Sequence, residues 1–144
     1  MAQINLDGLD TIDEMFKNIS EIPFSVTSEA LSAMAEAAEL QVKRAGEALG
    51  VRDPESRVHI LDKITHTKPK KTDSGGSCDV TFTGSRTRGK TRTRNAEIAF
   101  INEYGKRGQA PRPFIRQGAE QGASAIAAPG EKIIGDWYEK AAAK

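Results

Sequence analysis

The chain has 144 residues, a formal net charge of +1 and only 6% aromatic residues, which indicates one domain with a thin, helix-rich core. Its single cysteine, Cys78, excludes an intramolecular disulfide and a cysteine-based zinc site. No apolar run approaches the roughly 18 residues that cross a bilayer, and the start of the chain is acidic, so we expect a soluble protein without a secretory signal.

Charge is distributed unevenly along the chain. Residues 1–40 hold eight acidic side chains against Lys17 alone, a net charge of −7, so the remaining residues carry +8. The opposite charges could pair within one molecule, or they could steer head-to-tail contacts between copies. A closed ring uses contacts of the second kind.

An N-terminal helix is predicted within residues 1–23, ending at Pro23. Its apolar residues follow a helical stripe: Ile12, Met15, Phe16, Ile19 and Ile22. The rest of the single domain (1–144) is then a core over 24–128 and a C-terminal helical extension over 129–144.

A long helix is predicted over 28–49, with Thr27 as its N-cap and Gly50 as its stop. Its apolar residues recur every seven positions. They are Leu31, Ala35, Ala38, Val42, Ala45 and Leu49. Such a stripe packs on a sheet of its own domain or on a helix of another chain, and the sequence leaves both possible.

A short helix is predicted within 54–67, beginning at Pro54. The only two histidines, His59 and His66, lie in this stretch without a clear third ligand. We therefore expect surface or half-buried histidines and no metal site.

Two strands are predicted next. Residues 73–76 are typical of a turn, and 78–83 alternate apolar with polar residues. We pair this strand with a second one over 96–103. The predicted fold class is α+β, an antiparallel sheet of about three or four strands packed against the long helix and a C-terminal helix.

The connection 84–95 is strongly basic. Its charges fall at every second position: Arg86, Arg88, Lys90, Arg92 and Arg94. In an extended chain they would share one face about 6.6 Å apart, close to the phosphate spacing of a nucleic-acid strand. Disorder is a further possibility for this composition.

If residues 84–95 form a hairpin, the turn length decides where the arginines lie. A two-residue turn at Gly89 and Lys90 places Arg86 and Arg88 on one face and divides them from Arg92 and Arg94. A three-residue turn places arginine opposite arginine, which is destabilising. The two-residue turn is therefore expected in the absence of a polyanion.

Residues 97–117 are the most informative segment. They predict a short strand, a turn at Gly105, a stiff elbow over 110–113 and a new helix. Pro111 and Pro113 fix φ and keep the preceding residues extended, and Pro113 suits the first helical position.

The helix that follows is expected to end at Pro129. Small residues at Gly118, Ala119 and Gly122 indicate tight packing on a sheet or on the long helix. A last helical segment carries Trp137 and Tyr138, which could complete the core or anchor a neighbouring subunit.

Segment 97–117 resembles the tail-completion proteins of tailed phages, also called gp-ten-like head–tail connector or minor tail proteins. Members carry an acidic-aromatic-glycine turn, then Ala-Arg-Pro-Phe-Leu and a terminal helix. The matching residues are Glu103, Tyr104, Gly105, Ala110, Arg112, Pro113 and Phe114. The long helix matches as well, whereas residues 53–61 and the basic stretch 84–95 depart from the family pattern.

The resemblance implies a structural virion protein of a phage or prophage particle, made in the bacterial cytoplasm and located in the neck. It implies a ring of identical copies, a hexamer, between the head connector or adaptor and the tail terminator or tail tube. On this basis Glu103, Tyr104, Arg112, Phe114, Trp137 and Tyr138, together with the basic residues of 84–95, are candidate contact residues.

No enzyme is expected, because no nucleophile stands in a recognisable context with histidine and no phosphate-binding loop is present. No cofactor or membrane partner is expected either. Residues 84–95 could dock on an acidic ring partner or contact packaged DNA. The alternative function is a small basic module that binds nucleic acid without sequence preference, because no aromatic residues for base stacking lie among its arginines.

Overall fold

The computed structural model describes residues 21–52 and 59–144. Most of the helix predicted within 1–23 and the helix start predicted at Pro54 lie outside these residues, and the described residues 21–23 are not helical. The described elements are, in order, α2 (Phe24–Ala48), the 3-10 helix η1 (Ile60–Lys63), β1 (Ile64–His66), β2 (Lys70–Thr72), β3 (Gly75–Ser77), β4 (Val80–Phe82), β5 (Ser85–Arg88), β6 (Thr91–Arg94), α3 (Asn95–Tyr104), α4 (Phe114–Gln121) and α5 (Ala123–Ala142).

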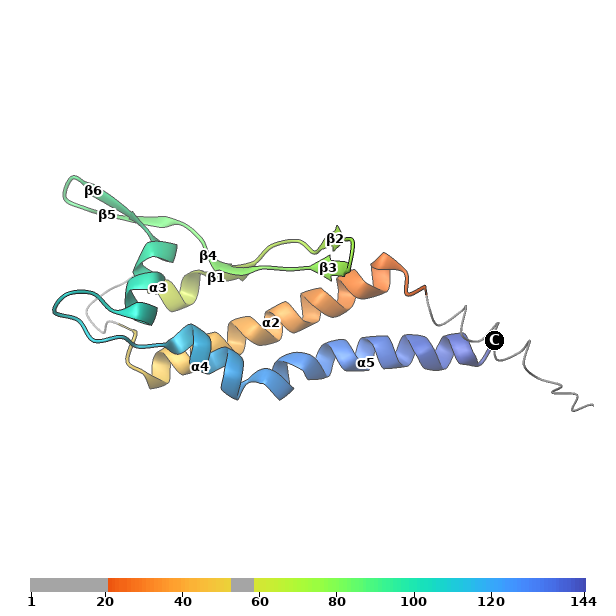
Figure 1. The fold of residues 1–144 in the computed structure, drawn as a ribbon. Helices are drawn as coiled ribbons and strands as arrows, with labels where there is room; N and C mark the ends of the chain where they lie inside the picture. The colour runs from red at the N-terminus through yellow and green to blue at the C-terminus, as the bar shows by residue number, and fades with distance from the viewer. Residues whose placement is uncertain (1–20, 53–58) are drawn as a thin grey trace, which may run out of the picture.

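The predicted α+β class is confirmed. Figure 1 shows α2 in the middle of an elongated molecule, with α4 and α5 along one side and the strands β1 to β4 along the other. The hairpin β5–β6 projects beside α3, at the end of the molecule opposite the C-terminus.

Helix α2 ends as predicted but starts earlier. Gly50 has φ +69°, its N–H donates to the Glu47 carbonyl, and the Val51 N–H donates to the Gly46 carbonyl. This pair of bonds is a Schellman motif, which glycine accommodates without strain. At the other end Pro23 is the N-cap. Thr27 lies inside the helix because nothing between it and Pro23 interrupts helical geometry.

The strands form three two-stranded antiparallel ladders rather than one sheet of three or four strands. Strand β4 pairs with β1, with Phe82 opposite Ile64, and not with residues 96–103. The prediction of a short helix within 54–67 is wrong for residues 59–67, which the structure describes. There the 3-10 helix η1 leads directly into β1. The predicted turn after β2 is confirmed, since Thr72 pairs with Gly75.

Residues 96–103, predicted as a strand, belong to helix α3. The Glu97 carboxylate accepts the Arg94 N–H at 3.3 Å, and the Asn95 side chain donates to the Thr83 carbonyl at 2.7 Å. These bonds fix the first turn of a helix. A short apolar run suits either a strand or a helix, and here the helical period buries Ala99 and Glu103 on one face.

The C-terminal break is also misplaced in the prediction. The chain leaves α4 at Gly122, and α5 runs through Pro129 without interruption, so 129–144 is not a separate extension. Packing on α2 explains both points. A Cβ at position 122 would lie 2.5 Å from Gln41 Cγ, and Gly130 lies directly against Met34 of the same helix.

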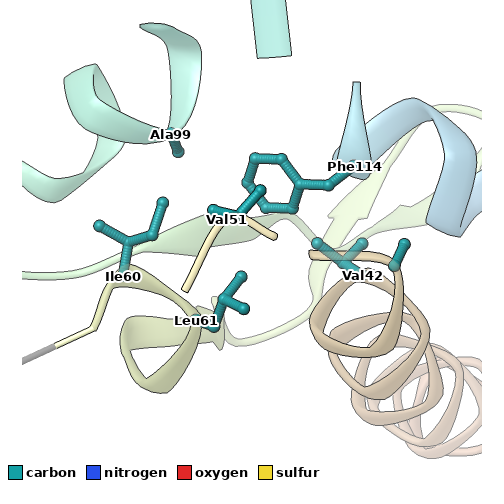
Figure 2. Close-up of a cluster of buried hydrophobic side chains, with 7 residues drawn as sticks. Val42, Val51, Ile60, Leu61, Ala99 and Phe114 are labelled. Carbon is teal, nitrogen blue, oxygen red and sulfur yellow. The ribbon is translucent and has the colours of Figure 1, made fainter. Parts of the chain in front are cut away.

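The seven-residue repeat of α2 packs within its own chain. Helices α4 and α5 lie along it on one side, and β1 and β3 on the other. Figure 2 shows the hydrophobic core beside the C-terminal half of α2, where Phe114 is 0% exposed. The buried members are Val42, Ala45, Val51, Ile60, Leu61, Ala99 and Phe114.

An ion-pair cluster joins the end of α2 to η1. The Arg52 guanidinium donates to both oxygens of Asp62, at 3.2 and 3.0 Å, and Lys43 lies 3.2 Å from the same carboxylate. Hydrogen bonds from Arg52 and Lys43 lower the pKa of Asp62 to about 2. The cluster is solvent-exposed, so it positions η1 more than it stabilises the fold.

Gly118 brings α4 close to α2 and provides a test of this packing. A Cβ at position 118 would lie 2.8 Å from Val42 Cα and 2.9 Å from the Gln41 carbonyl oxygen, and both are backbone atoms. We expect Gly118→Ala to lower the free energy of unfolding by about 1–3 kcal/mol, measured by urea denaturation.

Gly135→Ala is the matched control for Gly118→Ala. A Cβ at position 135 of α5 meets nothing within 4 Å, so the better helix propensity of alanine should stabilise by up to about 1 kcal/mol. Equal effects of the two substitutions would contradict the close approach of α4 to α2.

Candidate functional site

The candidate site is built on the turn that connects α3 to α4. Gly105 has φ +77°, and a Cβ there would lie 2.8 Å from the Gln109 carbonyl oxygen, so only glycine fits. Lys106 and Gln109 exchange two backbone hydrogen bonds, of 3.1 and 2.9 Å. The predicted glycine turn is confirmed, and it leads directly into the proline-containing elbow.

Arg112 fixes the elbow to two other elements. Its backbone N–H donates to the Asn102 carbonyl of α3 at 2.6 Å, and its Nη1 donates to the Gly50 carbonyl at the end of α2 at 2.7 Å. Pro111 and Pro113 have no N–H and stiffen the same stretch. Arg112, a predicted contact residue, therefore has a structural role.

Glu103 is a buried carboxylate at the N-terminus of α4. It is 7% exposed, and its two oxygens accept the N–H groups of Ile115 and Arg116 at 2.8 and 3.0 Å. The first N–H groups of a helix have no partner within it, and the helix dipole favours a negative charge there. The carboxylate thus joins α3 to α4, and Pro113 is the N-cap rather than the first helical residue.

Tyr104 and Phe114, the other two candidates in this segment, lie in opposite environments. Phe114 is buried in the core, where its ring packs edge-on against Phe82 at a centroid distance of 5.9 Å. Tyr104 is 68% exposed and packs against Phe100, which is 62% exposed, with the rings tilted and their centroids 4.7 Å apart. Of Tyr104 and Phe114, only Tyr104 is therefore available to a partner.

The exposed aromatic pair borders an apolar groove of about 780 Å³ between α3, the elbow, α4 and β4. Its apolar lining includes Val80, Phe82, Ala99 and Ile115. We call this feature the α3–α4 groove. Apolar clefts of about this volume are common at ligand- and peptide-binding sites.

Phe100 and Val80 are absent from the residues predicted from the sequence as contacts. In the predicted strand, Phe100 and Tyr104 would lie about 13 Å apart, at about 3.3 Å per residue. On a helix these two residues are four positions apart and therefore neighbours. A helical interpretation of 96–104 would have found the aromatic pair.

The basic connection forms the hairpin β5–β6 with the predicted two-residue turn. Arg86 pairs with Thr93, and Arg88 with Thr91, around Gly89 and Lys90. Gly89 has φ +62°, as such a turn requires. The register that avoids arginine opposite arginine is therefore confirmed.

This register divides the arginines between two faces. Arg86 and Arg88 share one face and Arg92 and Arg94 the other, because opposite residues of a ladder point to the same side. Arg86 is half-buried, and the others are exposed. Within residues 21–52 and 59–144, no ion pair neutralises these four guanidinium groups.

Trp137 and Tyr138 are half-buried neighbours on α5, with their rings edge to face at 5.2 Å. They lie in the C-terminal half of α5, which runs away from α3 towards the C-terminus (Figure 1). The structure thus separates the predicted contact residues into three places, namely the elbow, the hairpin and α5.

Both histidines are half-buried, and His66 hydrogen-bonds the Glu39 carboxylate. Across the described part of the chain, no three metal-ligating side chains gather. Nor is any described helix both long and apolar enough to span a bilayer.

No protein-family model, curated protein or solved structure matches this chain.

The Glu103 carboxylate can be tested by a substitution that keeps its shape. Glutamine offers one acceptor oxygen and no charge to two N–H donors, so Glu103→Gln should lower the free energy of unfolding by about 1–3 kcal/mol. Glu120→Gln, on the exposed side of α4, is the control and should change it by less than about 0.5 kcal/mol. Urea denaturation of both variants decides, and an unchanged stability of Glu103→Gln would contradict the proposed cap.

Proposed function

We propose that this protein is a structural component of a tailed-phage or prophage particle, a tail-completion protein that joins copies of itself into a ring, a hexamer, between the head connector and the tail tube. The observation that carries this proposal is the α3–α4 groove with its exposed pair Phe100 and Tyr104. The groove lies on the segment whose sequence resembles that family.

The geometry of the groove favours binding over catalysis. Its lining is largely apolar, and its one buried carboxylate, Glu103, is already bonded to two backbone N–H groups. An open apolar groove of this size accommodates a protein segment. The proposed chemistry is therefore recognition between protein surfaces.

The charge distribution supports contacts between copies. Residues 84–120 hold nine Arg and Lys side chains against three Glu, a net charge of +6. They form the end of the molecule with the hairpin. Of the acidic residues within 21–40, Glu21 precedes α2, while Glu29, Glu36 and Glu39 lie on α2, which extends towards the other end (Figure 1). In the described ranges no ion pair joins these two regions, which favours pairing between molecules.

A ring component should form one discrete oligomer. We expect sizing chromatography and native mass spectrometry of the purified chain to give a single copy number above one. Because opposite charges guide the contact, assembly should weaken as salt rises from about 0.1 to 1 M. A chain that stays monomeric, even with the head-connector and tail-tube proteins of its own particle, would contradict the proposal.

A second candidate function, non-specific binding of nucleic acid, is favoured by the unpaired arginines of the hairpin β5–β6. Each face of the hairpin offers two arginines, so a bound duplex would contact about two phosphates. The affinity should then fall about tenfold between 50 and 200 mM salt. Fluorescence anisotropy with a labelled duplex measures this dependence.

The double variant Arg88→Ala and Arg92→Ala leaves one arginine on each face, so it should weaken duplex binding and reduce the fall in affinity between 50 and 200 mM salt from about tenfold to about threefold. Lys70→Ala with Lys71→Ala is the matched control, since it removes the same charge from exposed positions of β2. If both double variants bind the duplex as tightly as the parent chain, the hairpin is not a nucleic-acid site.

A further inference from the structure

The α3–α4 groove presents an unpartnered helix face. Ala96, Phe100 and Tyr104 repeat at helical spacing along α3 and line the groove together with Ile115 and Ala119 of α4. Arg116 of α4 also lines the groove, and strand β6 of the hairpin contacts α3. The groove therefore fits an amphipathic helix with an apolar stripe and acidic flanks.

The N-terminal segment, residues 1–20, has this chemistry. Its stripe of Ile12, Phe16 and Ile19 would occupy one side of a helix. The acidic residues Asp7, Asp10 and Glu14 would fall on the opposite side at 100° per residue, and Asp13 at its edge. Residues 1–20 carry four acidic side chains and one lysine, a net charge of −3, against +6 for residues 84–120.

The segment joins the described chain at the start of α2, and the groove lies farther along this helix. It precedes Phe24, the start of α2, whereas the groove lies level with Val42, where Gly118 of α4 packs. Those two levels are about 27 Å apart along α2 at 1.5 Å per residue. Residues 1–20 therefore join the described chain at the end of α2 that is remote from the groove of the same molecule.

We propose that the N-terminal segment of one copy binds the α3–α4 groove of the next, with its acidic side facing Arg116 and the hairpin. The two ends of the molecule then form a heterologous, head-to-tail contact, which closes a ring when the rotation between copies allows it. This inference rests on the proposed ring and specifies the contact that builds it.

Two full-length variants test the contact. Ile12→Ser with Phe16→Ser disables the segment, and Phe100→Ser with Tyr104→Ser disables the groove at exposed positions. Each variant alone should raise the concentration needed for assembly by about tenfold or more. Mixed together, the two should form a one-to-one heterodimer in native mass spectrometry, because one intact groove and one intact segment remain.

Matched controls exclude general effects of the substitutions. Leu40→Ser removes an apolar side chain that is 47% exposed on α2, outside the groove, and Asn18→Ser changes the segment away from its central stripe. Both should assemble like the parent chain. Ala119→Trp fills the groove while keeping both aromatic residues, so it should also block assembly if the serine variant folds poorly.

Several results would overturn the contact. If the parent chain forms a ring and both double variants do so equally well, the ring stands but is built by another surface. If both variants are monomeric and their mixture stays monomeric, the segment and the groove are not partners. A parent chain that never assembles overturns both this contact and the proposed ring.

Discussion

The arrangement of the candidate site depends on the buried carboxylate of Glu103. Its oxygens hold the first turn of α4 by two backbone N–H groups, and in doing so they fix the angle between α3 and α4. A carboxylate loses much hydration on burial, and the bonds to a helix N-terminus offset that loss. Phe114, the next residue anchored after the elbow, then enters the core at 0% exposure. The α3–α4 groove exists because these two anchors leave the other face of α3 uncovered.

Electrostatics gives the molecule two different ends. The acidic first part of α2 and the basic hairpin β5–β6 are separated by the length of the central helix (Figure 1). Opposite charges on distant ends attract between molecules when the chain cannot bring them together within one. The apolar groove beside the hairpin adds area that a charge pair alone lacks. The shape of the groove and the distribution of charge therefore both favour a head-to-tail contact between two copies.

The sequence predicts local structure well where one residue decides it. Gly50 ends α2, and the two-residue turn at Gly89 sets the register of the hairpin, because backbone conformation and repulsion between arginines leave few alternatives. It fails where distant parts of the chain decide. The apolar pattern of residues 96–103 fits a strand, but the hydrogen bonds of Asn95 and Glu97 fix the first turn of a helix. Likewise, Pro129 lies within a continuous helix because α5 packs along α2. The role of Glu103 needs the fold, since its donors lie 12 and 13 residues away.

The central claim is that copies meet head to tail, and cross-linking of an isotopically mixed sample tests it directly. Equal amounts of ¹⁴N and ¹⁵N protein would be combined, treated with a lysine-reactive cross-linker and analysed by mass spectrometry. The account predicts mixed-isotope links from Lys17 in the N-terminal segment to Lys90 in the turn of the hairpin or to Lys106 in the turn after α3. Links from Lys17 only to lysines of its own molecule, or none to residues 84–120 in the assembled protein, would contradict it.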